Sequence, residues 1–187
     1  MNSQQQNYQA NIQEIAYAGD SVTYGFDVKH DNRDLPVQVQ FNQDRNFNPT
    51  GASKPLQQNL WDCRIGVLDQ KSGGQGSSGG AQTGTAMAPS AQAWNSSIPG
   101  TDLEVQQYTR ACIDKFLTTH NNMALRFDVQ PDNHDRQRLL DSIVSDLSKQ
   151  HTYRQITVNH NRFIVPDQMH DQWQESLKSY TPATSNR

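Results

Sequence analysis

The residues of this chain that could carry out chemistry are its two cysteines and six histidines. Nucleophilic catalysis needs a thiol whose pKa is lowered, for example by a nearby cation. Cys63 lies in the segment Trp61-Asp62-Cys63-Arg64, where Arg64 could have that effect. This pattern supports an alternative function as a small cytoplasmic hydrolase or translocated effector that uses Cys63. In the competing interpretation Cys63 is a small apolar residue of a β-strand, and Cys112, on the apolar stripe of a helix, is typical of a buried thiol.

Metal ligands would come from the acidic residues and histidines, but these do not show the spacing that metal sites use. The closest approaches are His30-Asp31 and the segment 132–135, and the latter is better explained as the start of a helix. The glycine-rich segment 73–80 lacks the lysine and the helix-opening context of a phosphate-binding loop. We therefore predict no catalytic residue, no metal and no cofactor, and expect a non-enzymatic protein.

Nucleic-acid binding would need a basic surface, and the composition does not supply one. The chain has 16 Lys and Arg against 19 Asp and Glu, for a net charge of −3. The candidate contacts of a nucleic-acid adaptor are five arginines of the C-terminal part: Arg126, Arg136, Arg138, Arg154 and Arg162. Carboxylates are interleaved with these arginines, which is typical of solvated faces. A nucleic-acid adaptor is therefore the less favoured alternative.

An uncharged stretch rich in Gly, Ser, Thr and Gln occupies residues 72–100. Such a composition buries too little apolar surface to offset its ordering entropy, so it predicts a flexible linker or arm. Trp94 lies near its far end, between Met87 and Ile98. One interpretation makes Trp94, with Met87 and Ile98, a partner-binding anchor, because one ring can bury up to about 250 Å² in a pocket. In the other, Trp94 packs back on its own chain.

Before this arm, residues 1–71 predict a small antiparallel β-meander behind a polar N-terminal tail. Ile12–Ala18 and Ser21–His30 flank a Gly-Asp turn, as in a hairpin. The second of these runs alternates apolar and polar residues, which is typical of a half-buried strand. Further strands are expected at Val37–Phe41 and Trp61–Leu68. The edges of such a sheet need cover from another element, another copy or a partner.

After the arm, residues 101–187 predict an α+β module in the order α-β-α-β-β-α. The expected elements are a helix at Asp102–His120, a strand at Leu125–Val129, a helix from about 131 to 150, a hairpin of Tyr153–Val158 and Arg162–Val165, and a helix at Pro166–Tyr180. We expect a three-stranded sheet with helices on one side. The fold class is thus α+β, with two modules joined by the Gly/Ser-rich tether.

The composition also bears on location and function. Only 33% of the residues are hydrophobic and the mean hydropathy is −0.88, so each small core is thin and would gain from association. No run of 18 apolar residues and no signal-peptide pattern is present, so we expect no membrane partner and a cytoplasmic protein, or a particle assembled there. The favoured function is a structural or adaptor component of a larger assembly, such as a virion, phage tail or secretion machine. It would bind a protein partner or self-associate through two modules and an arm.

Overall fold

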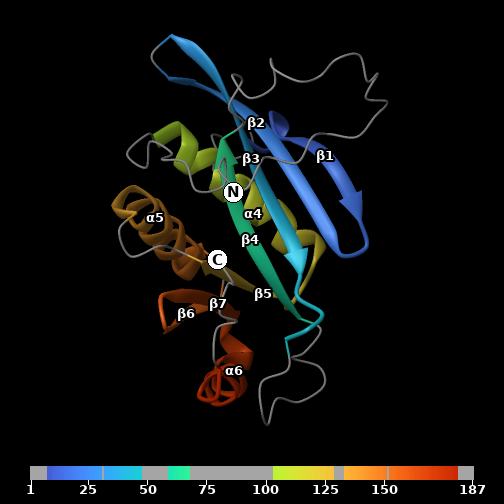
Figure 1. Cartoon of the computed structure of the whole chain (residues 1–187), viewed down its shortest axis with the longest axis vertical. Helices are drawn as coiled ribbons and strands as arrows, with labels where there is room; N and C mark the ends of the chain where they lie inside the picture. The colour runs from blue at the N-terminus through green and yellow to red at the C-terminus, as the bar shows by residue number, and fades with distance from the viewer. Residues whose placement is uncertain are drawn as a thin grey trace, which may run out of the picture.

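A computed structural model describes residues 8–30, 32–47, 59–67, 103–128, 133–150 and 152–180. Its seven strands form one mixed sheet in the order β1-β2-β3-β4-β5-β7-β6, with helices packed against it (Figure 1). The elements are β1 (Gln13–Ala18), β2 (Ser21–His30), β3 (Arg33–Gln43), β4 (Leu60–Val67), α4 (Leu103–Thr119), β5 (Ala124–Asp128), α5 (His134–Gln150), β6 (Tyr153–Val158), β7 (Asn161–Pro166), η1 (Asp167–Met169) and α6 (His170–Leu177). The predicted α+β class is confirmed.

The first four strands form the predicted antiparallel meander. In β2 the alternate residues Val22, Tyr24, Phe26 and Val28 are buried, because their side chains share one face of the strand. The third strand is longer than predicted. Its pairing with β2 runs from Arg33 to Asn42, so it begins four residues before the predicted strand Val37–Phe41.

Strand pairing joins the segment 59–67 to the segment 103–128. β4 pairs in parallel with β5, and Leu60, Trp61 and Asp62 stand opposite Ala124, Leu125 and Arg126. Parallel neighbours need a crossover connection, and α4 is the described helix that lies between the two strands in the chain. The strands predicted for residues 1–71 and for residues 101–187 therefore lie in one sheet. The predicted linker 72–100 lies outside the described residues.

One face of this sheet packs against α4 and α5. Phe116 of α4 stacks on Phe41 of β3 with ring centroids 4.1 Å apart, and it meets Trp61 of β4 edge-on at 5.1 Å. Nearer the start of α4, Tyr108 stacks on Phe26 of β2 at 4.9 Å. A single cluster of buried residues joins these strands to both helices. The amphipathic stripe read from the sequence of α4 therefore covers the apolar face of the meander.

The other face of the sheet is covered at one end by α6, so the expectation of helices on one side only is wrong. Trp173 and Leu177 of α6 form a second buried cluster that includes Phe163 and Val165 of β7. Ile164, between these two, belongs to the first cluster. Because Phe163, Ile164 and Val165 are consecutive and all buried, β7 is covered on both faces. A short continuous apolar run in a sequence is typical of such a strand.

Local turn and cap signals behave as expected where they are described. Asn159 and His160 have φ values of 47° and 67° and form the tight turn between β6 and β7. Positive φ at these positions supports the predicted hairpin. Asn133 accepts a hydrogen bond from the backbone N–H of Arg136 at 3.1 Å, so it caps α5 as the sequence indicated.

Candidate functional site: an open sheet edge and a polar pocket

The strand β1 forms one edge of the sheet, and β2 is its one neighbour among the described strands (Figure 1). Its residues are exposed except for Ile15, which is half-buried. Tyr17 is 60% exposed on this strand. Among the described residues, Tyr17 and Leu103, at the start of α4, are the exposed large hydrophobic side chains. Among the described residues no strand pairs with the outer side of β1, and such an edge with an exposed aromatic ring is a natural place for another strand to pair.

A β-bulge shapes this edge. The register between β1 and β2 shifts between Glu14 and Ala16, so Ile15 has no partner of its own. Ile15 lies over Gly25, where a Cβ atom would be only 2.3 Å from the Ile15 Cδ1 atom. Gly25 thus makes room for the bulged side chain. After the bulge, Ala16, Tyr17 and Ala18 pair regularly with β2 and present a regular edge.

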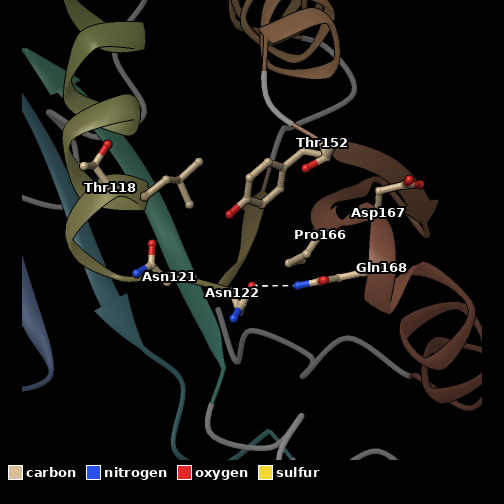
Figure 2. Close-up of a pocket in the computed structure, with 9 residues that line it drawn as sticks. Thr118, Asn121, Asn122, Thr152, Pro166, Asp167 and Gln168 are labelled. Carbon is tan, nitrogen blue, oxygen red and sulfur yellow. Dashed lines mark hydrogen bonds between the residues drawn. The ribbon is translucent and has the colours of Figure 1, made fainter.

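A polar pocket lies where the end of α4, the start of β6 and the end of β7 come together (Figure 2). Its volume is about 530 Å³. Three carboxamides line it, from Asn121, Asn122 and Gln168, and Gln168 Nε2 donates a hydrogen bond of 2.9 Å to Asn122 Oδ1. Asn122 has a φ of 62°, a backbone conformation that asparagine tolerates better than most residues. The amide pair thus bridges the turn after α4 to the segment that follows β7.

Hydroxyl groups and a small apolar surface complete the pocket. Thr118, Thr152 and Tyr153 contribute hydroxyl groups, while Leu117 and Pro166 contribute carbon atoms. Thr118 Oγ1 donates to the Asp114 carbonyl at 2.7 Å, which fixes its rotamer. Burial raises the pKa of Tyr153, so its phenol stays protonated at neutral pH. The pocket therefore offers uncharged donors and acceptors around a limited apolar patch.

Cys63 and Cys112 do not have the surroundings of a nucleophile. Both thiols are buried, and burial raises the pKa of each. Arg64, the neighbour expected to activate Cys63, is exposed, and consecutive strand residues point to opposite faces. The local environment of Cys63 therefore acts against thiolate formation, and it supports the interpretation as a packed strand residue.

We expect both thiols to be almost inert toward a thiol reagent in the native protein. Labelling must then wait for unfolding, so its rate at neutral pH should be at least about a thousandfold below that of a model thiol. In denaturant the two cysteines should react at once. Time-resolved labelling followed by mass spectrometry measures both rates. Rapid native labelling at Cys63 alone would revive the hydrolase alternative.

Most of the arginines considered as nucleic-acid contacts are engaged within the protein. Arg126 forms ion pairs with Asp44 and Asp62. Arg154 and Arg162 pair with aspartates as well. Burial lowers the pKa of Arg136 to about 10, and this guanidinium is not on an open surface. Of the five, Arg138 and Arg154 are exposed. These arginines do not form a basic surface, which supports the interpretation as internally balanced charges.

In residues 8–30, 32–47, 59–67, 103–128, 133–150 and 152–180, no three His, Cys, Asp or Glu side chains come together to hold a metal ion. Within the same ranges no helix is both long enough and apolar enough to cross a bilayer.

The sequence pointed only in part to these sites. Trp94, Met87 and Ile98, the predicted partner-binding residues, lie outside the described residues. Reasoning from the sequence expected open edges in the meander but did not single out Tyr17. The pocket was also missed. Its available signal in the sequence was the pair Asn121-Asn122 after the predicted helix, because asparagine tolerates a positive φ.

Comparisons of the chain with protein-family models, with curated proteins and with solved structures found no match. Function therefore has to be inferred from the geometry of the described residues.

Proposed function

We propose that this protein is a non-enzymatic structural or adaptor component of a larger assembly, formed in the cytoplasm, of the kind found in virions, phage tails or secretion machines. The observation that carries the proposal is the open edge at β1, with Tyr17 60% exposed on it. Natural sheets usually cover or charge such edges, because they are templates for pairing. Glu14 is the one charged residue of β1 and precedes the bulge, so the regular part of the edge is uncharged.

The occupant we propose for this edge is β1 of a second copy, paired antiparallel about a two-fold axis. An axis at Tyr17 places the Tyr17 rings of the two copies opposite one another, on the face that holds Val22, with Ala16 opposite Ala18 on either side. A cross-strand pair of aromatic rings is favourable by about 0.2–1 kcal/mol. The paired residues Ala16, Tyr17 and Ala18 are uncharged, so these pairs bring no like charges together. Pairing would add a second seven-stranded sheet to the first and remove both exposed edges at β1.

Replacing Tyr17 with Lys should weaken this association. A lysine at this position forfeits the pair of rings and places two ammonium groups opposite one another, so the Kd for self-association should rise at least tenfold. Light scattering coupled to size-exclusion chromatography, over a range of micromolar concentrations, measures the mass. Circular dichroism checks that the variant is folded.

The matched control is Leu103→Lys, which removes the other exposed large hydrophobic side chain from a site at the start of α4. The control should keep the mass and the concentration dependence of the original protein. A monomer at every concentration would overturn self-pairing at β1. So would an oligomer whose mass responds to Leu103→Lys and not to Tyr17→Lys.

A further inference from the structure

The polar pocket beside α4 has a charge pattern that restricts its ligand. Its described lining residues include no Lys, Arg or His, and Asp167 is the one carboxylate among them. Asp167 points away from the cavity in Figure 2 and forms an ion pair with Arg154. An anion would find no cation among these described residues, and a cation would have to compete with Arg154. The pocket is therefore matched to a neutral ligand.

The hydrogen-bonding groups of the pocket further restrict the class of ligand that it can bind. The carboxamides of Asn121, Asn122 and Gln168 each carry one acceptor oxygen and two N–H donors. The bond between Gln168 and Asn122 uses one donor and one acceptor, and so leaves the Gln168 oxygen and the Asn122 amino group for other partners. Thr118 and Thr152 add hydroxyl oxygens. A ligand that satisfies this mixture needs several groups that both donate and accept.

The shape and the carbon lining also fit a small molecule of this kind. A volume of about 530 Å³ lies within the range of about 300–1,000 Å³ usual for small-molecule sites. Leu117 and Pro166 provide an apolar patch of limited size. A molecule with a ring of C–H groups on one side and hydroxyl groups around its rim would use both parts of the lining.

We propose that this pocket binds a neutral, polyhydroxylated ligand, namely a saccharide unit. Sugar hydroxyls act as donor and acceptor at once, which suits a pocket in which the Gln168 oxygen can accept a hydrogen bond and the Asn122 amino group can donate one. The apolar C–H face of the ring packs on Leu117 and Pro166. Because the pocket lies beside β6 and β7, at the opposite edge of the sheet from β1, this binding is separate from strand pairing at β1.

The test uses the full chain labelled with ¹⁵N and titrated with glucose, galactose and N-acetylglucosamine in turn. For a single sugar unit we expect a Kd near 1 mM, so titration to about 50 mM should saturate the site. At least one sugar should shift the side-chain amide signals of Asn121, Asn122 and Gln168, with a single saturating curve. The mass measured by light scattering should not change.

Two variants and a control separate specific binding from surface effects. Gln168→Ala removes one amide, and Asn122→Asp removes the amino donors while keeping a residue that tolerates positive φ. Each should raise the Kd about tenfold, which corresponds to losing about 1.4 kcal/mol of binding. Gln172→Ala removes an exposed amide of α6 outside the pocket and should leave the Kd unchanged.

The absence of saturable shifts with all three sugars would overturn the proposal. It would also be overturned by shifts that rise linearly and spread over the surface, or by binding that survives both pocket variants. None of these outcomes bears on self-association at β1, whose readout is the mass of the Tyr17→Lys variant.

Discussion

Replacing Arg126 with Met is expected to lower the free energy of unfolding by about 3 kcal/mol. Arg126 Nε and Nη2 donate to the two carboxylate oxygens of Asp62 at 2.6 and 2.7 Å, and Nη2 also donates to Asp44 at 2.9 Å. The guanidinium side chain is 14% exposed. Methionine fills much of the same space but leaves two carboxylates facing one another without a cation. This is the costly case, in which one partner of a partly buried ion pair is removed.

The ion-pair network of Arg126 joins two strands that are far apart in the chain. Asp62 belongs to β4 and Arg126 to β5, and the two stand directly opposite one another in the parallel register. Arg126 Nη1 also donates to the Tyr180 hydroxyl at 3.2 Å. The pKa of Arg126 is raised because its hydrogen bonds and charge contacts with Asp62 outweigh desolvation. The guanidinium therefore stays charged at every pH at which the protein folds.

Urea denaturation measures the loss, and Arg154→Met is the matched control. Arg154 also pairs with an aspartate, but its side chain is 59% exposed, so its removal should cost less than about 1 kcal/mol. Adding Asp62→Asn to Arg126→Met should restore part of the stability, because it removes one of the unpaired charges. Equal losses for the two arginine variants, with no recovery in the double variant, would show that the network contributes nothing beyond a surface pair.

Truncating Phe116 to Ala should lower the free energy of unfolding by about 3–5 kcal/mol. The ring is fully buried and lies between Phe41 of β3, Trp61 of β4 and His120 after α4. Its removal leaves a cavity bordered by rings that cannot collapse without moving the sheet away from the helix. Phe116→Leu retains most of the volume, and its cost should be less than half as large.

Because Phe116 connects α4 to strands that precede residues 72–100 in the chain, its loss should destabilise both parts of the chain together. Far-ultraviolet circular dichroism and tryptophan fluorescence should therefore report one coincident transition in the original protein and in Phe116→Ala. A first transition that is lowered by the substitution, followed by a second that is unchanged, would contradict this expectation. It would favour two modules that unfold independently.

Local structure was predictable from the sequence because periodicity is a local property. The bounds of β2 and β6 agree with the prediction, and α4 differs from it by one residue at each end. The last predicted helix was too long, since it begins as the 3-10 turn Asp167–Met169 and ends at Leu177. Pro166 belongs to β7 instead, where the absence of an N–H is tolerated at a strand end.

Contacts between distant segments were not predictable in the same way. Nothing in the local pattern of Leu60–Val67 indicates that it pairs with Ala124–Asp128, because register between strands depends on the whole sheet. The ion pairs of Arg126 and the amide bridge from Asn122 to Gln168 follow from that arrangement. Nothing in the sequence indicates that an arginine and an aspartate more than 60 residues apart form an ion pair.

The order of elements along the chain has a consequence for synthesis on the ribosome. The apolar face of the meander is complete once Val67 has been made, but the helix that covers it ends only at Thr119. At about 5–20 residues per second, the nascent chain spends several seconds with Phe26, Phe41 and Trp61 uncovered. During this interval a bare apolar sheet face is a substrate for chaperones and for aggregation between neighbouring nascent chains. The protein should therefore reach its native state in higher yield when translation between these two elements is fast.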